Sequence, residues 1–259
     1  GRLPFLIMQK LSGKAALITG GNGGIGLATA KLFQEHGARL AITGRNQDTL
    51  RNAQHVLGND ALVLQSDTGK LADIDATMKE VQTRFGRLDV LFVNAGASQP
   101  APFEHVTEER FDEVCATNFK GAFFTIQKAL PLLAEGASVI VTTSVSNQRG
   151  APNFSVYAAC KAALRSLVQS LALDLIKRGI RVNAVSPGPI DIPGFGQRWD
   201  MPPETVQAVK DEFVRKAPMK RFGRPDEVAK VALFLASDDA SHLVGTEIVV
   251  DGGVALPLH

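Results

Sequence analysis

Three side chains in the second half of the sequence have the types and the spacing that proton transfer requires. Tyr157, the only tyrosine of the chain, stands four residues before Lys161 and thirteen after Ser144. Positions i and i+4 of a helix share one face, with Cβ atoms about 5–6 Å apart. An ammonium at that distance favours the ionised phenol, so the spacing predicts that Lys161 lowers the pKa of Tyr157 and makes it a proton donor near neutral pH. Surface helices also carry this pair by chance, so the rest of the chain has to decide between the two interpretations.

A glycine-rich turn lies between a predicted strand and a predicted helix near the start of the chain. The segment reads Thr19-Gly20-Gly21-Asn22-Gly23-Gly24-Ile25-Gly26. Glycines let the backbone turn tightly and approach a pyrophosphate, which then sits at the N-terminus of the following helix. We therefore predict a dinucleotide site formed by Gly20, Asn22, Gly23, Gly24, Ile25 and Gly26.

The end of the second predicted strand indicates which dinucleotide binds. NAD sites usually place an acidic residue about 20 residues after the glycines, where it binds the ribose hydroxyls. Here the strand ends in Thr43-Gly44-Arg45-Asn46, and the guanidinium of Arg45 matches a phosphate. We therefore predict NADP in preference to NAD. The alternative remains that Arg45 is an ordinary solvated loop residue and that backbone groups alone hold the ribose.

Short apolar runs alternate with helical patterns along the whole chain. The runs lie at 15–19, 39–43, 61–64, 90–93, 138–141, 180–185 and 247–250. They lack strict polar alternation, which is typical of strands that are covered on both faces. The pattern predicts an α/β fold with a doubly wound, mostly parallel, seven-stranded sheet and helices on both faces, as in a Rossmann-like domain.

We expect one domain over residues 8–259, with residues 1–7 as a leader. Residues 191–216 interrupt the alternation with a long loop and a short amphipathic helix. Loops of this length in a compact domain are usually functional, so we expect a lid over the substrate.

Composition excludes several classes of function. The chain has 28 basic and 26 acidic residues, and its formal net charge of +2 argues against a dominant role in binding nucleic acid or a membrane surface. Its histidines and its two cysteines show no metal-ligand spacing, so we expect no metal site. Cys115 and Cys160 form no disulfide framework, and free thiols suit a cytoplasmic setting.

Taken together, these segments resemble the short-chain dehydrogenase/reductase family, in its shorter single-domain branch. The resemblance runs from Leu11 to Pro257. It rests on the glycine turn, Asn94-Ala95-Gly96, Asn118, the Ser144, Tyr157 and Lys161 set, Pro187-Gly188 and the ending Val250-Asp251-Gly252-Gly253. It implies an NADP-dependent oxidoreductase that transfers a hydride between nicotinamide and a ketone or secondary alcohol.

The resemblance also implies a role for each matching residue. Tyr157 would be the general acid/base, Ser144 would donate to the substrate oxygen, and Lys161 would hold the nicotinamide ribose. Asn118 would position a water that feeds protons to Lys161. The family usually forms tetramers or dimers through the helices that hold Asn118 and Tyr157, so we expect a homo-oligomer.

Further cofactor contacts follow from the resemblance. Asp67, with Thr68 beside it, would hold the adenine, and the segment 94–96 (Asn94, Ala95 and Gly96) would line the adenosine ribose. Pro187, Gly188 and Ile190 would border the nicotinamide. Many relatives have threonine where Ile192 stands here, so one cofactor contact is in doubt.

The sequence does not name the substrate. Candidate polar contacts are Ser98, Gln99, Ser146, Asn147, Gln148 and Arg149, and candidate apolar ones are Phe195, Trp199 and Met201. A 3-oxoacyl-thioester reductase of the same family is an alternative, but it needs a basic docking surface for an acidic carrier. A dinucleotide sensor without turnover is a second alternative, and such a protein would be expected to lack the tyrosine or the lysine.

Overall fold

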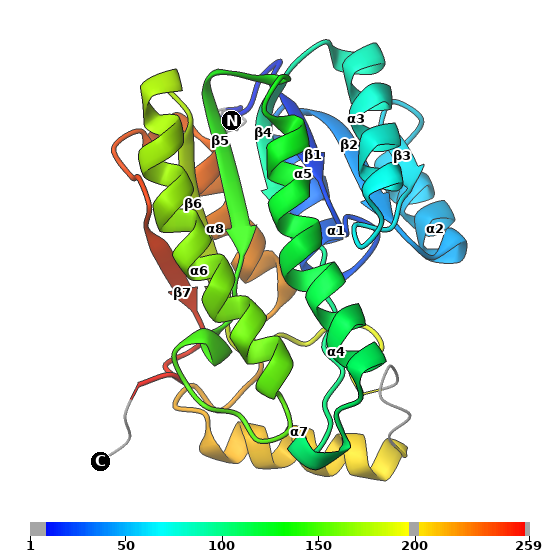
Figure 1. Cartoon of the computed structure of the whole chain (residues 1–259), viewed down its shortest axis with the longest axis vertical. Helices are drawn as coiled ribbons and strands as arrows, with labels where there is room; N and C mark the ends of the chain where they lie inside the picture. Colours follow the sequence, from blue (N-terminus) through cyan, green and yellow to red (C-terminus); the bar gives the residue numbers. More distant parts are fainter. Residues whose placement is uncertain (1–8, 197–201, 257–259) are drawn as a thin grey trace, which may run out of the picture.

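The structure is a computed structural model that describes residues 9–196 and 202–256 (Figure 1). The expected leader 1–7 lies outside the described residues, as do Trp199 and Met201 of the expected lid. The helices are α1 (Gly24–Glu35), α2 (Gln47–Leu57), α3 (Leu71–Phe85), α4 (Glu108–Cys115), α5 (Gly121–Ala129), α6 (Ser155–Leu175), α7 (Pro203–Lys216) and α8 (Pro225–Ala236).

The described residues form one seven-stranded sheet in which every neighbouring pair of strands is parallel. The strands are β1 (Ala15–Ile18), β2 (Arg39–Gly44), β3 (Leu62–Gln65), β4 (Leu88–Val93), β5 (Leu133–Thr142), β6 (Arg181–Pro187) and β7 (Glu247–Val250). Their order in the sheet is β3-β2-β1-β4-β5-β6-β7. The predicted fold class is confirmed.

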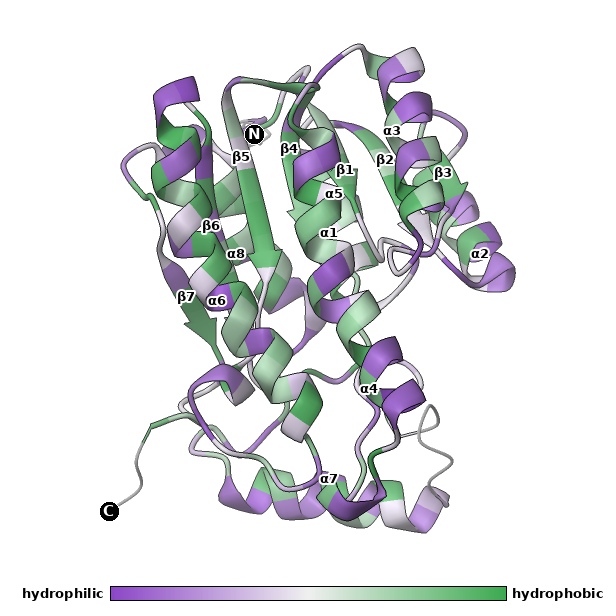
Figure 2. Cartoon of the chain, viewed as in Figure 1, coloured by the Kyte–Doolittle hydropathy of each residue, from purple (hydrophilic) through white to green (hydrophobic). Residues whose placement is uncertain are grey.

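Helices cover both faces of the sheet, and each face has its own hydrophobic core. On one face, α3, α5 and α6 pack on strand residues such as Leu17, Leu91 and Val139. On the other face, α1, α2 and α8 pack on the alternating residues, such as Ile18 and Phe92. Because successive strand side chains point to opposite faces, a strand buried on both sides reads as one continuous apolar run. Figure 2 shows this pattern as green strands behind helices that alternate between green and purple.

The strand order reverses between β1 and β4, and ligands of open α/β sheets bind at such a switch point, beyond the carboxyl ends of the strands. In Figure 1 the arrows of β5 and β7 point toward the end of the molecule where α7 lies. The helix of the expected lid therefore lies at the end of the sheet where the sequence places the reactive residues.

One strand differs clearly from its predicted bounds. β5 begins at Leu133, five residues before the apolar run that identified it, and the register with β4 shifts between Leu88 and Val90. Glu135 and Gly136 are exposed in this early part. Polar, exposed residues leave no apolar signal, so the pattern alone could not show that the strand extends there.

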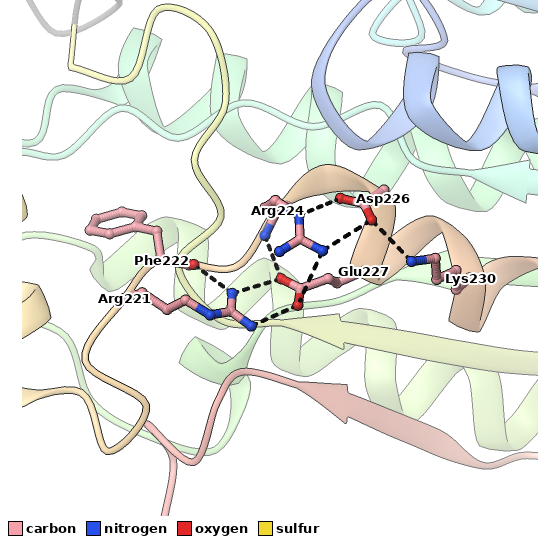
Figure 3. Close-up of polar contacts among 6 residues, drawn as sticks. All are labelled: Arg221, Phe222, Arg224, Asp226, Glu227 and Lys230. Carbon is pink, nitrogen blue, oxygen red and sulfur yellow. Dashed lines mark hydrogen bonds and ion pairs between the residues drawn. The ribbon is translucent and has the colours of Figure 1, made fainter.

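Charged side chains hold the turn that leads into α8 (Figure 3). Glu227 Oε2 accepts from Arg221 Nη1 at 2.8 Å, and Glu227 Oε1 accepts from Arg221 Nη2 at 2.7 Å. Glu227 Oε2 also accepts from the backbone N of Arg224 at 2.7 Å, which closes a capping box at the start of the helix. These hydrogen bonds, with Arg221 first, hold the pKa of Glu227 at about 2, below its ordinary value of 4.5.

This turn supports the chain segment that follows β6. Gly223 N donates to Pro189 O at 3.0 Å, and Asp191 N donates to Gly223 O at 2.8 Å. The turn that Glu227 holds is thus hydrogen-bonded to the segment that the family resemblance places beside the nicotinamide.

A Glu227→Gln variant should change how stability depends on pH. Because the folded pKa of about 2 is depressed below 4.5, the charged carboxylate stabilises the fold above about pH 4.5, and that contribution is lost as the pH falls toward 2. The wild type should therefore exceed the variant in urea midpoint at about pH 6, by a small margin because the pair is partly exposed, and the difference should shrink at about pH 3.5. Glu80→Gln on the exposed face of α3 is the control. A difference that stays constant with pH would contradict this role.

Candidate active site

The structure brings Ser144, Tyr157 and Lys161 together. Ser144 follows β5 and is buried, and a hydrogen bond joins its side chain to that of Tyr157 near the start of α6. Lys161 Nζ lies 5.5 Å from the centroid of the Tyr157 ring. Ser144 Oγ and Ser146 Oγ are 2.7 Å apart, so both serines lie at this spot.

The predicted lowering of the Tyr157 pKa by Lys161 is wrong for the chain without ligands. Burial raises the pKa of the phenol above its ordinary value, the hydrogen bond with Ser144 lowers it in part, and the neighbouring thiol of Cys160 raises it. The physical reason is that burial penalises the charged phenolate. The helical spacing predicted that Tyr157 and Lys161 meet. It could not predict how strongly burial removes the phenol from water.

Lys161 is a buried ammonium that binds the end of β5. Its side chain is only 3% exposed, and Nζ donates to Thr142 O at 2.8 Å. Burial lowers the pKa of Lys161 to about 8. The amine therefore changes its charge close to physiological pH, as a group that exchanges protons must do.

Asn118 lies in a single π-helical turn, Ala116–Lys120, between α4 and α5. Its side chain is fully buried. Nδ2 donates to Ala97 O at 2.7 Å and to Val114 O at 2.9 Å, while Oδ1 accepts from Ala97 N at 3.2 Å. Such π-turns are rare and often occur at functional sites. The π-helical turn thus places the Asn118 side chain in contact with Ala97, in the segment that follows β4.

Gly96 allows Asn118 and Lys161 to approach the same point of the backbone. A Cβ atom placed on Gly96 would lie 3.0 Å from Asn118 Oδ1 and 3.4 Å from Lys161 Nζ. Both separations are tighter than ordinary van der Waals contact, so this position favours glycine for reasons of space. Asn118 and Lys161 therefore converge beside the residue that ends the Asn94-Ala95-Gly96 motif.

The glycine turn has the geometry of an anion site at the start of α1. A Cβ on Gly26 would lie 2.1 Å from Gly20 O, so only glycine lets helix and strand approach so closely. No side chain caps the N-terminus of α1, and its first turn holds no acidic residue. A Cβ on Gly23 would meet nothing within 4 Å. This helix end thus has no side-chain cap and has room beside Gly23, which fits the pyrophosphate of a dinucleotide.

Asn94 joins the glycine turn to the chemical end of the site. Its Nδ2 donates to the carbonyls of Thr19 and Gly20 at 3.2 and 3.3 Å, and its Oδ1 accepts from Thr142 Oγ1 at 3.1 Å. Thr142 is the residue whose carbonyl holds Lys161. Thr19 Oγ1 in turn accepts from the backbone N of Asn94 and of Ala95. The sequence did not predict these connecting roles of Thr19 and Thr142. The one feature that could have indicated them is that both residues stand at the ends of predicted strands.

Arg45, Asp67 and Thr68, the residues expected at the adenosine, follow the ends of β2 and β3. Arg45 is exposed just after β2, and no carboxylate occupies the strand end. Asp67 Oδ1 accepts from Gly69 N at 2.9 Å, so one of its oxygens already stabilises its own turn. Thr68 is buried. Asn22 donates to Thr49 Oγ1 at 2.7 Å and packs against Gly44, which brings the glycine turn to the end of β2.

The segment after β6 runs over the glycine turn. Pro187 ends β6, and Gly188 packs against Asp251 of the C-terminal segment. Ile190 is buried, and Ile192 lies over Gly24, where its Cγ2 would be 3.2 Å from a Cβ on that glycine. Ile192 thus makes an apolar contact with the glycine turn at the position where many relatives have threonine.

Most of the candidate substrate contacts have partners within the protein. Asn147 and Gln148 donate to Glu247, and Gln99 donates to Glu113. Arg149 donates to Val254 O. The Phe195 ring packs edge-on against Phe222, at 5.5 Å between centroids. These contacts therefore engage the side chains within the protein.

The two cysteines meet beside the site. Cys160 Sγ lies 3.7 Å from Cys115 Sγ, and both are free thiols. Burial raises the pKa of Cys160 to about 12, which keeps the thiol protonated at neutral pH. Among residues 9–196 and 202–256, no His, Cys, Asp and Glu side chains gather in a group of three or more that could hold a metal ion. No helix in this part of the chain is long and apolar enough to cross a membrane.

Known proteins match this chain over nearly its whole length. A family model described as enoyl-(acyl carrier protein) reductase matches residues 20–255. The oxidoreductase asL5 of Sarocladium schorii is 44% identical over 252 residues, which cover 96% of this chain and 98% of that protein.

Two solved structures also superpose closely. The crystal structure of levodione reductase has a TM-score of 0.90 at 33% identity and covers 96% of this chain and 100% of its own. A short-chain dehydrogenase/reductase named glucose/ribitol dehydrogenase, from Brucella melitensis, has a TM-score of 0.89 at 32% identity and covers 96% of this chain and 99% of its own. Because the match holds in sequence and in structure, this chain belongs to the short-chain dehydrogenase/reductase family and is an oxidoreductase acting on CH–OH or C=O groups.

Proposed function

We propose that this protein reduces a ketone, or oxidises the matching secondary alcohol, with NADP as its cofactor and Tyr157 as its general acid/base. The observation that carries the proposal is the Tyr157 phenol, hydrogen-bonded to Ser144 and with the buried amine of Lys161 at 5.5 Å from its ring. The names of its relatives include both a reductase and a dehydrogenase, which supports chemistry at a carbonyl or an alcohol.

Each residue of the set has one task in this proposal. The bound nicotinamide would supply or accept the hydride. Ser144 donates to the substrate oxygen, and Tyr157 delivers a proton to that oxygen as negative charge develops on it. The ammonium of Lys161, beside the ring, stabilises the phenolate that remains after the proton has moved. Asn118 stands beside Lys161 at Gly96 and would position a water that returns the proton.

The cofactor assignment rests on two features of the described chain. The uncapped N-terminus of α1 fits a pyrophosphate, and the exposed Arg45 after β2 fits the 2′-phosphate that distinguishes NADP from NAD. Further cofactor contacts are proposed for Asp67, Thr68, Asn94, Ala95, Gly96, Pro187, Gly188 and Ile190.

We also propose that residues 191–216 form a lid within a single domain spanning residues 8–259. Lys210 of α7 pairs with Asp191 at 2.7 Å and lies 5.5 Å from the Phe195 ring centroid, so α7 is tied to the loop that precedes it.

A homo-oligomer is supported by exposed apolar side chains on α4 and α6, Phe111 and Leu173. The two free thiols support a cytoplasmic setting.

The thioester-reductase alternative receives less support from the structure. Lys210 pairs with Asp191, and both Arg215 and Lys216 pair with Glu212. These basic side chains are neutralised by acids of the same protein, so they offer no strong attraction to an acidic carrier.

A panel of sugars, polyols, ketones and a 3-oxoacyl thioester, scored by the absorbance of the reduced nicotinamide, tests the proposal. Turnover of none of them with either cofactor would refute it.

The Tyr157→Phe variant removes the proton donor and keeps the ring. Because general acid–base catalysis contributes about 10²–10⁴-fold, kcat should fall by at least about 100-fold, while the Kd for NADPH measured by its fluorescence should stay within about twofold. Retained turnover would refute the assignment of Tyr157.

The pKa of Lys161, about 8, predicts a basic limb in the activity profile. Above that pH the amine is neutral and no longer stabilises the phenolate, so kcat/KM for carbonyl reduction should fall about tenfold per pH unit. In Lys161→Arg the charge persists to higher pH, so the limb should move upward even if the maximum rate is lower. A limb at the same pH in both proteins would show that another group controls it.

The Arg45→Ala variant tests the choice of cofactor. Removal of a charge-assisted contact to the 2′-phosphate should raise the Kd for NADP by about tenfold or more and leave the Kd for NAD nearly unchanged. Arg51→Ala, at an exposed arginine of α2, is the matched control. An equal loss of affinity for both cofactors would remove the phosphate role of Arg45.

A further inference from the structure

The carboxylate of Glu247, at the start of the edge strand β7, is almost completely enclosed by hydrogen-bond donors. The side chain is only 8% exposed. Oε1 accepts from Thr143 Oγ1 at 2.5 Å and from Asn147 Nδ2 at 2.6 Å. Oε2 accepts from Gln148 Nε2 at 2.8 Å and lies 3.3 Å from Arg165 Nε. The carboxylate thus binds two separate parts of the chain, residues 143–148 and Arg165 of α6.

Two of these contacts bracket the serine of the proposed catalytic set. Thr143 immediately precedes Ser144, and Asn147 ends the short 3₁₀ turn Val145–Asn147 that Ser144 caps. Glu247 therefore binds a side chain on each side of Ser144. A turn fixed at both ends has little freedom to move its serine hydroxyl away from Tyr157.

The contact with Arg165 extends this connection to α6. Arg165 stands four residues after Lys161 and eight after Tyr157, so all three lie on one stripe of the helix. The carboxylate consequently binds the Ser144 turn and the helix that presents the phenol and the amine.

We infer that Glu247 is a positioning residue of the active site, which sets the distance between the Ser144 hydroxyl and the Tyr157 phenol by binding the Ser144 turn and α6 at once. The consequence for turnover rests on the proposed function, but the geometry does not. A carboxylate suits the place because both of its oxygens accept, and four donors converge on it. An amide has one accepting oxygen, and its NH₂ group would face donors, so the turn would have to shift.

The experiment compares Glu247→Gln with wild type and with Glu80→Gln, a charge-neutralising control on the exposed face of α3. Tyr157 is the only tyrosine, so the phenolate absorbance titrates this one residue without substrate or cofactor. Because the hydrogen bond with Ser144 lowers the pKa of Tyr157, a displaced Ser144 should move the titration to higher pH. In Glu80→Gln the titration should match the wild type.

Turnover provides the second measurement. Displacement of a reacting group by about 1 Å can cost about 100-fold, so kcat of Glu247→Gln should fall by about tenfold or more, with the Kd for NADPH within about twofold of wild type. Lower thermal stability with an unchanged tyrosine titration and unchanged kcat would overturn the inference and leave Glu247 as a stabilising residue of β7. If the wild type turns over no substrate, the proposed function fails, and the titration still decides the role of Glu247.

A milder variant covers the case in which Glu247→Gln does not fold. Thr143→Val removes one donor to the carboxylate and keeps the shape of the side chain. It should shift the tyrosine titration in the same direction by a smaller amount. A titration identical to that of wild type would overturn the inference.

Discussion

The buried ammonium of Lys161 is the interaction on which the rest of the site depends. An unpaired charge in the interior is costly, so the chain must supply partners that hold it in place. Thr142 supplies a carbonyl at 2.8 Å, and the Tyr157 ring lies 5.5 Å away. Thr142 also binds Asn94, and Asn94 binds the glycine turn. One cation thereby connects the ends of β1, β4 and β5, and a change at any of these strand ends alters the surroundings of Lys161.

The parallel sheet explains why these segments meet. All strands end at the same edge, and the strand order reverses between β1 and β4, so the glycine turn and the proposed catalytic residues lie on either side of the reversal. The sheet supplies the positions, and local irregularities adjust the side chains. The π-turn at Asn118 and the missing side chain of Gly96 allow an amide and an ammonium to approach one point. A regular helix and a residue with a Cβ would hold them apart.

Much of the fold could be predicted because its signals are local. Strands covered on both faces read as apolar runs, and all seven runs became strands of the parallel sheet. The meeting of Ser144, Tyr157 and Lys161 was also predicted, from helical spacing together with the family resemblance. The hidden start of β5 was not predicted, because Glu135 and Gly136 carry no apolar signal. The polar residues after Ser144 were interpreted as substrate contacts, yet Asn147 and Gln148 bind Glu247.

The sequence by itself determined which groups share a helix face and which glycines the turn requires, because both are set by neighbours within a few residues. Only the tertiary structure decided how those groups behave. The direction of the Tyr157 pKa depends on how much water burial removes, and that is a sum over distant segments. Likewise, Glu247 reaches the Ser144 turn across about 100 residues of chain, a separation at which no sequence pattern reports a contact.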